Sequence, residues 1–184
     1  MSTISKFSYN IVNAPALSQL VQVKDLYEYS FPEQERRPWD SFSALIESGV
    51  PFFKFVTVTD NASGAIVGFY TEWSFPGAVY VEHFAVRKEL RGAGAGSKIL
   101  SHIVESAGDK AVVVEVEPKD TDENAPRRIK FYEKAGFTPL YDYEYMQPPY
   151  APGLPEVPLM LMTTKKLPDL DTFVIQLHTL VYNK

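Results

Sequence analysis

A glycine-rich segment constrains the fold of this chain more than any other feature. Residues 91–97 read Arg-Gly-Ala-Gly-Ala-Gly-Ser. They follow a predicted strand, Val79–Val86, and lead into a predicted helix, Gly96–Ala107, whose apolar residues recur at helical spacing. Glycine is needed where backbone adopts positive φ or approaches a ligand closely. The apolar run Ala111–Glu117 follows and is typical of a central strand buried on both faces. The order strand, loop, helix, strand predicts a βαβ unit with two parallel strands.

The rest of the chain predicts further strands and helices around this unit. We expect strands over Phe7–Val12, Phe52–Thr59, Ala65–Trp73, Pro139–Met146 and Val157–Thr163, and helices over Pro15–Ser30, from Asp40 or Ser41 to Glu47, over Pro126–Ala135, and after an Asp171 cap to about residue 183. Gln147–Pro158 holds five prolines and is expected to be irregular. The prediction is one α/β domain over residues 1–184, with a central mixed twisted sheet of about seven strands flanked by helices.

Composition narrows the classes of function. The chain has 184 residues and a formal net charge of -5, whereas a nucleic-acid binder needs a basic surface. It has no cysteine, which excludes disulfides, thiolate metal sites and cysteine nucleophiles. Its three histidines are scattered without metal-ligand spacing, so no metal site is expected.

Nothing in the sequence predicts a membrane protein or a secreted one. No apolar run approaches the ~20 residues that a membrane-spanning helix needs. Residues 1–10 hold one lysine and no long apolar block, unlike a secretory signal. The expected location is the cytoplasm.

The glycine-rich segment has the properties of an anion site. The first N–H groups of a helix lack intrahelical partners, and the helix dipole adds partial positive charge there, so a diphosphate fits. The Walker pattern fails because Ser97 precedes Lys98, the reverse of the required order. The dinucleotide pattern G-x-G-x-x-G fails because Ser97 and Ile99 stand where its third glycine belongs.

The same segment resembles motif A of the GNAT N-acetyltransferase superfamily, Arg/Gln-x-x-Gly-x-Gly/Ala, which Arg91, Gly94 and Gly96 match. The preceding residues Glu82–Val86 look like the fourth strand of that family. Residues Phe131–Phe137 look like its motif B. The three landmarks occur in the family's order and span residues 79–137, the expected CoA-binding core.

The resemblance implies that acetyl-CoA, as a co-substrate, binds in a V-shaped gap between the fourth and fifth strands. Its pyrophosphate and pantetheine would contact the loop and the fourth strand, at Arg91, Gly92, Ala93, Gly94, Ala95, Gly96 and Ser97, and at Phe84, Ala85 and Val86. Family members often hold the pantetheine arm with an Asn seven residues before the motif B tyrosine. Here Ala125 has that position, so Asn124 is the nearest candidate. Arg127 and Arg128 follow and are open to the CoA 3′-phosphate or to solvent.

The resemblance also implies the catalytic residues. Tyr132 stands where many members have a tyrosine that protonates the CoA thiolate, and Glu82 where glutamates often deprotonate the amine. Alternation along a strand places Glu82 and Phe84 on one face and His83 on the other. Glu115 and Glu117 are further acids on the next strand, where either could attract a cationic amine.

The expected activity is transfer of an acetyl group from acetyl-CoA to a primary amine, on a small molecule or a peptide, by direct attack in a ternary complex. A non-catalytic acyl-CoA sensor or interaction module is the alternative, and an unrelated nucleotide-binding protein is a further one. The proline-rich loop is open to two roles, covering a pocket or recruiting a partner. The apolar stripe of the last helix leaves a homodimer contact open.

Overall fold

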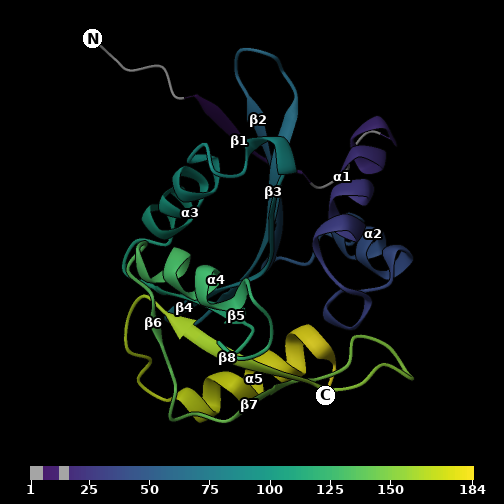
Figure 1. Ribbon diagram of the computed structural model, residues 1–184. Helices are drawn as coiled ribbons and strands as arrows, with labels where there is room; N and C mark the ends of the chain where they lie inside the picture. The colour runs from purple at the N-terminus through teal and green to yellow at the C-terminus, as the bar shows by residue number, and fades with distance from the viewer. Residues whose placement is uncertain (1–5, 13–16) are drawn as a thin grey trace.

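One mixed sheet organises the molecule (Figure 1). The computed structural model describes residues 6–12 and 17–184. The strands are β1 (Phe7–Ile11), β2 (Phe53–Asp60), β3 (Ile66–Phe75), β4 (Ala78–Val86), β5 (Ala111–Val116), β6 (Thr138–Pro139), β7 (Tyr145–Gln147) and β8 (Val157–Thr163). Their order is β1-β2-β3-β4-β5-β8-β6, with β7 paired to β8. Among the strands of the described residues, only β4 and β5 pair in parallel. The predicted α/β class, mixed sheet and parallel βαβ unit are confirmed.

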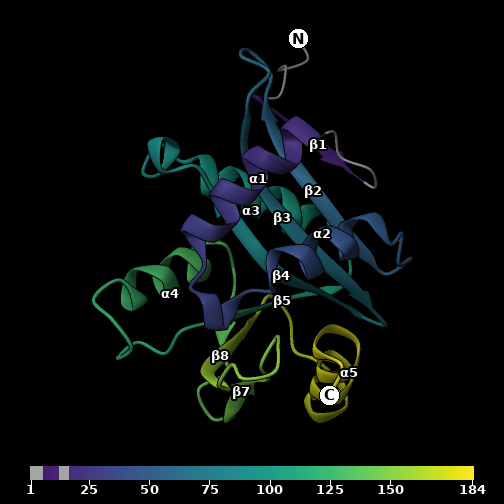
Figure 2. The same ribbon diagram turned by 90° about the vertical axis from the view of Figure 1, so that its right-hand side faces the viewer.

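Helices cover both faces of the sheet (Figures 1 and 2). On one face lie α1 (Leu17–Ser30), α2 (Trp39–Glu47) and α5 (Leu170–Tyr182), and on the other α3 (Ala95–Ser106) and α4 (Ala125–Glu133). Two short 3-10 turns, η1 (Glu33–Glu35) and η2 (Lys88–Leu90), follow α1 and β4. The ring of Tyr27 stacks on Phe42 at 4.3 Å on the first face, and Ile99, Leu100 and Ile103 are buried on the second. Apolar residues at helical spacing thus hold each helix to the sheet.

The predicted strand Pro139–Met146 is wrong. The chain leaves the sheet after β6, where Tyr143 N–H donates to the Leu140 carbonyl at 3.2 Å, and returns only at β7. The alternation Tyr-Asp-Tyr-Glu-Tyr from Tyr141 to Tyr145 imitates a strand, but Tyr141 is 65% exposed and Tyr145 is buried. The turn therefore separates two short strands.

Several predicted boundaries also move. The cap of α5 is Asp169, whose Oδ1 accepts the Thr172 N–H at 2.9 Å, and Asp171 lies in the first turn. Helix α2 starts at Trp39 after Pro38, which provides no side-chain cap. Of the predicted helix Pro15–Ser30, residues 15 and 16 lie outside the described residues. The ends of the proline-rich segment join β7 and β8, and residues 148–156 between them are irregular.

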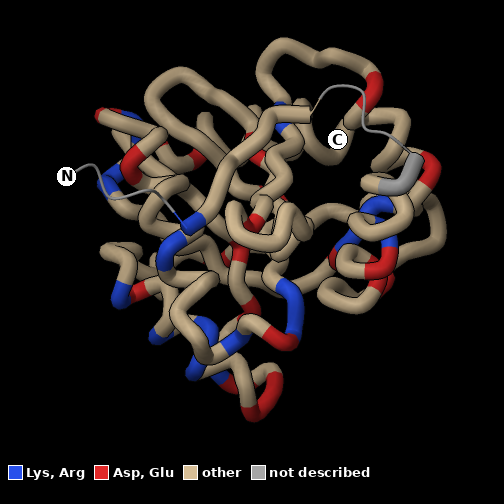
Figure 3. Tube along the Cα trace, turned by 90° about the horizontal axis from the view of Figure 1, so that it is seen from above, with Lys and Arg blue, Asp and Glu red and all other residues tan. Residues whose placement is uncertain are grey.

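Two observations concern the molecule as a whole. Among the described residues, no helix is both long and apolar enough to cross a membrane. In Figure 3, Lys and Arg positions are interspersed with Asp and Glu positions around the outside of the trace.

The close contact of β3 with β4 predicts the effect of a single methyl group. A Cβ added at Gly68 would lie 2.6 Å from the carbonyl oxygen of Ala85, so β4 must shift. We expect Gly68→Ala to lower the free energy of unfolding by ~1–3 kcal/mol, measured by urea denaturation.

Gly96→Ala is the matched control. Its Cβ would have its nearest contact with Phe131, at an ordinary 3.5 Å, and the helix should gain up to ~1 kcal/mol in stability. Equal stability of the native protein and Gly68→Ala would contradict the steric argument.

Candidate functional site

The strands β4 and β5 separate halfway along their length. Their parallel pairing runs from Ala78 with Ala111 to Val81 with Val114 and then stops. At that point β4 has a bulge, since Thr71 pairs with His83 and the next residue of β3, Glu72, pairs with Val81. A bulge bends its strand and disrupts the local ladder. A cleft of about 1120 Å³ opens where the strands part.

The cleft brings together most of the residues predicted for the site. Of these it is lined by Glu82, Phe84, Ala85, Val86, Arg91, Gly92, Gly94, Gly96, Ser97, Asn124 and Tyr132. Ala93 and Ala95 are not among its lining residues. The Ala93 N–H donates to Leu90 at 3.4 Å, and the Ala95 side chain is buried in the core.

Because of the bulge, Glu82, His83 and Phe84 do not occupy the faces of the sheet that strict alternation predicts. Glu82 and His83 lie on the α1 side of the sheet, where Glu82 contacts Trp73 and His83 packs against Phe42. Phe84 lies on the opposite side and packs against Phe131. The extra residue in the bulge shifts the alternation by one position. Glu82 and Phe84 therefore do not share a face.

The main chain of β4 beyond the bulge presents polar groups to the gap. Arg87 N–H donates to the Val67 carbonyl of β3, and the direction of backbone groups alternates along an antiparallel strand. The N–H and C=O groups of Phe84 and Val86 therefore face away from β3, toward the gap, while those of Ala85 face β3. The Val86 carbonyl accepts a hydrogen bond from Arg91 Nε at 3.1 Å, which fixes the loop against the strand.

The glycine-rich loop ends in a helix N-terminus at the cleft. Gly92 and Gly94 have φ angles of 80° and 79°, which favour glycine. Gly94 is the N-cap of α3, so the N–H groups of Ala95, Gly96 and Ser97 have no intrahelical acceptors. The Gly92 and Gly94 N–H groups have no hydrogen-bond acceptor in the part of the chain that the structure describes. This arrangement suits an anion.

Tyr132 reaches the same cleft from α4. Its ring packs edge-on against Phe131 and Phe137. Burial raises the pKa of its hydroxyl well above the usual value, and Glu117 adds to the effect. The phenol therefore keeps its proton at neutral pH.

Glu82 is held in a buried ion pair that sequence reasoning missed. Its Oε1 accepts from Arg37 Nε at 2.8 Å and its Oε2 from Trp73 Nε1 at 2.7 Å. Burial alone would raise the pKa of Glu82, but Arg37, with the hydrogen bonds, lowers it. A carboxylate that is paired with a buried cation and has a lowered pKa is a weak proton acceptor.

Arg37 and the proline-rich loop complete the inner wall of the cleft. Arg37 also donates to the Val181 carbonyl at 2.6 Å, near the end of α5. Tyr150, from the proline-rich loop, lies over the Arg37 guanidinium at 5.1 Å and stacks on His83. Of the two roles left open for this loop, the structure supports covering a pocket.

Glu115 lines the cleft among tyrosines, another feature that sequence reasoning missed. Its carboxylate accepts hydrogen bonds from the hydroxyls of Tyr145 and Tyr182. Burial raises the pKa of Glu115 to about 7, although these hydroxyls act against the rise. Tyr145 and Tyr182 stand 37 positions apart in the sequence, and no local spacing identifies them as neighbours of Glu115.

The outer part of the cleft holds charged groups of both signs. Arg128 pairs with Glu117 at 2.8 Å and Asp122 at 2.7 Å, which leaves Arg127 as the arginine of α4 open to a ligand. Burial, with repulsion from Glu117, raises the pKa of Glu35 to about 7. Asn124 stands at the N-cap of α4. No group of three or more potential metal ligands occurs among residues 6–12 and 17–184.

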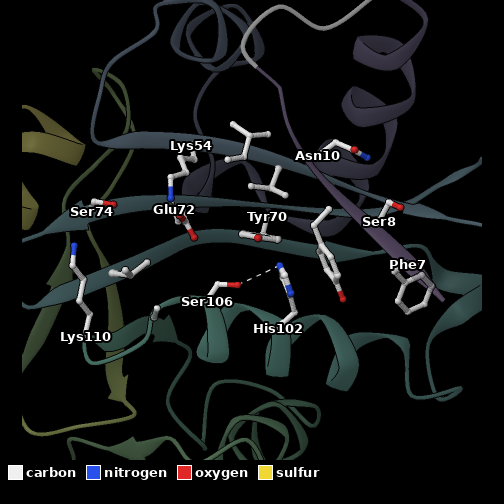
Figure 4. Close-up of a pocket in the computed structure, with 15 residues that line it drawn as sticks. Phe7, Ser8, Asn10, Lys54, Tyr70, Glu72, Ser74, His102, Ser106 and Lys110 are labelled. Carbon is white, nitrogen blue, oxygen red and sulfur yellow. Dashed lines mark hydrogen bonds and ion pairs between the residues drawn. The ribbon is translucent and has the colours of Figure 1, made fainter. Parts of the chain in front are cut away.

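A second hollow lies between α3 and the sheet (Figure 4). Lys54 pairs there with Glu72 at 2.6 Å, and Ser106 lies 3.3 Å from His102. Its volume is about 730 Å³. It lacks the features of the cleft, because no glycine loop, helix N-terminus or separated strand borders it. We therefore assign the chemistry to the β4–β5 cleft.

Comparisons with known proteins agree with this geometry. The family model described as an acetyltransferase (GNAT) domain matches residues 52–139. A solved structure of a candidate acetyltransferase from the GNAT family of Bacteroides thetaiotaomicron is 30% identical, with a TM-score of 0.86, over 96% of this chain and 99% of that chain.

Two further comparisons are more distant. The candidate acetyltransferase YjbC of Bacillus subtilis is 31% identical over 61% of this chain, a match that spans only 54% of the relative. The spermidine N-acetyltransferase of Vibrio cholerae, solved with CoA and spermine, is 11% identical over 86% of this chain and 94% of that chain, with a TM-score of 0.62. At that identity the likeness shows a shared fold.

The buried pair predicts a large loss of stability when one partner is removed. Arg37→Met leaves Glu82 buried without its cation, and we expect a loss of ~3–5 kcal/mol in the free energy of unfolding at pH 7. The double variant Arg37→Met/Glu82→Gln should lose less. Because the pKa of Glu82 is lowered on folding, its contribution is present above the unfolded value of ~4.3 and lost as pH falls through the folded value.

Lys54→Met is the control for this prediction, measured by urea denaturation. Its ion pair with Glu72 has a Lys side chain that is 43% exposed, so its loss should cost at most ~1 kcal/mol. If Arg37→Met cost no more than the control, the buried pair would not have the role assigned to it.

Proposed function

This chain belongs to the GNAT acetyltransferase family, and on that premise we propose that it is an N-acetyltransferase that transfers the acetyl group of acetyl-CoA to a primary amine by direct attack in a ternary complex. The observation that carries the proposal is the parting of β4 and β5 beside a helix N-terminus. The cleft there combines an anion site, outward-facing backbone groups and a protonated tyrosine.

The residues of the cleft fit a CoA thioester. The N–H groups of Gly92, Gly94 and Ala95–Ser97 would take the pyrophosphate, and Arg127 is open to the 3′-phosphate. The main chain of Phe84 and Val86 would accompany the pantetheine arm, with Asn124 at the entrance. A backbone N–H of β4 would polarise the thioester carbonyl, as an oxyanion donor does.

The reaction balances with one acid and one base. The ammonium loses a proton to a base, and the free nitrogen attacks the thioester carbon. The tetrahedral intermediate loses the second nitrogen proton, the C–S bond breaks, and its electron pair stays on sulfur. Tyr132 O–H protonates the thiolate, and the phenolate recovers a proton from water. The products are the amide, CoA and one proton released to solvent.

Glu82 supports this reaction as a positioning residue. Its carboxylate fixes Arg37 and Trp73 at the point where the strands part. A direct role as the base requires that it release Arg37, which the buried pairing disfavours.

The acceptor amine would enter from the side of η1 and β5. The carboxylates of Glu115 and Glu117 and the aromatic ring of Tyr150 line this part of the cleft, and such groups attract a cationic amine. The spermidine N-acetyltransferase that shares the fold acts on such an amine.

Binding of acetyl-CoA tests the pyrophosphate seat. Ser97→Trp puts a bulky side chain at the mouth of the loop without the strain that any side chain would cause at Gly94, where φ is positive. We expect calorimetry with acetyl-CoA to show binding to the native protein and none to Ser97→Trp. Lys98→Trp, outside the cleft, is the matched control and should bind. Absence of binding to the native protein would refute the proposal.

Turnover tests the acid. Tyr132→Phe should lower kcat by ~10²–10⁴-fold, the usual contribution of a positioned acid, and leave acetyl-CoA affinity nearly unchanged. The measurement is release of free CoA with a panel of amines that includes spermidine, a lysine ester and a peptide with a free N-terminus. Acetyl-CoA binding without turnover of any amine would instead favour the non-catalytic sensor.

A further inference from the structure

Resting on the N-acetyltransferase function proposed above, we propose that Glu115, held by tyrosines from β7 and α5, is the catalytic base that removes the proton from the acceptor ammonium. The strand position, the hydrogen bonds of its carboxylate and the ion pairs of two neighbouring acids, Glu82 and Glu117, support this assignment.

Glu115 stands at the place where the strands part. Val114 is the last residue of β5 that pairs with β4, and Glu115 is the next. It still pairs with Leu161 of β8, so its backbone is fixed on one edge while the other edge borders the gap. Its side chain lines the cleft and lies on the side of Tyr182 and Tyr145. A base in this position faces the cleft from a rigid strand.

Neutral hydroxyls surround the carboxylate. Tyr182 O–H lies 3.0 Å from Oε1 and 2.8 Å from Oε2 of Glu115, and Tyr145 O–H donates to Oε1. Tyr182 oxygen is in turn 3.1 Å from that of Tyr80 and accepts from Tyr150 at 3.3 Å. The four tyrosines come from β4, β7, the proline-rich loop and α5. They orient the carboxylate without adding a positive charge.

Two neighbouring carboxylates of the cleft, those of Glu82 and Glu117, are less suited to the role. Glu82 is paired with Arg37 and Trp73, and Glu117 with Arg128. Glu115 forms no ion pair within the described part of the chain. Arg37, the cation of the inner wall, is engaged by Glu82 and the Val181 carbonyl. Glu115 therefore keeps the capacity to accept a proton.

The surroundings of Glu115 shift its pKa in the direction that a base at neutral pH requires. Burial is the main cause that raises its pKa to about 7, repulsion from Glu82 adds to it, and the hydroxyls of Tyr145, Tyr182 and Tyr80 lower it. Burial also raises the pKa values of the tyrosines, Tyr150 included, far above their ordinary value. Each tyrosine thus keeps its proton, and the carboxyl titrates where a base at neutral pH should.

The proton steps follow from these contacts. The ammonium of the acceptor gives one proton to the Glu115 carboxylate, which later releases it to solvent. The free nitrogen then attacks the thioester carbon and loses its second proton to solvent. The C–S bond breaks with its electron pair on sulfur, Tyr132 protonates the sulfur, and the phenolate recovers a proton from water. The base and the acid are separate groups that approach the cleft from β5 and α4. Their environments raise the pKa of Glu115 to about 7 and keep the hydroxyl of Tyr132 protonated.

The pH dependence of kcat tests the assignment, with acetyl-CoA and the best amine of the panel. In the native protein kcat should rise with pH through about 7, because the carboxyl must be ionised. Glu115→Gln should lower kcat by ~10²–10⁴-fold and abolish this rise. Tyr145→Phe removes a hydrogen bond that lowers the pKa of Glu115, so the rise should move to higher pH. This second variant keeps the test valid if Glu115→Gln does not fold.

Glu35→Gln is the matched control, since the pKa of Glu35 is also raised to about 7. The rise near pH 7 should persist in this variant, and its disappearance would assign the base to Glu35. Unchanged kcat and pH profile in folded Glu115→Gln would overturn the inference and leave the proposed function intact. Calorimetry separates failure of the base assignment from failure of the proposed function, because absence of acetyl-CoA binding to the native protein refutes the function itself.

Discussion

The buried ion pair of Arg37 with Glu82 is the contact on which the arrangement of the cleft depends. It joins the segment after α1 to the bulge of β4, and Arg37 extends the link to the end of α5 through the Val181 carbonyl. Removing two charges from water is costly, and such a pair is stable only when further hydrogen bonds satisfy it. Trp73 supplies one of them for Glu82, so three distant parts of the chain meet at the point where the sheet opens.

The sheet opens at Glu82, the same residue that pairs with Arg37. The pairing of β4 with β5 stops next to the bulge at Glu82, so the backbone groups of Phe84 and the N–H of Val86 face a gap where a regular ladder would have satisfied them. Unpaired backbone groups need partners, and a ligand with amides along its length can supply them. The irregularity in the strand and the binding cleft are thus one feature of the fold.

The carboxylates of the cleft differ because their surroundings differ. Glu82 has a cation and a lowered pKa, while Glu115 has only hydroxyls and a raised one. Two identical side chains that line one cleft thus have pKa values shifted in opposite directions by their neighbours. The resemblance to the family implies Glu82 as the base, and the local sequence around Glu82 contains no information on Arg37, 45 residues away in the sequence.

The local elements could be predicted from the sequence alone, because periodicity and glycine spacing are short-range properties. They include the glycine loop between strand and helix, the parallel βαβ unit, the α/β class and the family. The faces that Glu82, His83 and Phe84 occupy could be read only from the folded chain, since one extra residue in a strand reverses the alternation. The tertiary structure alone brought Tyr80, Tyr145, Tyr150 and Tyr182 together near Glu115, and Arg37 to Glu82. The environments that set pKa values arise from contacts between segments far apart in the chain, and no local pattern encodes them.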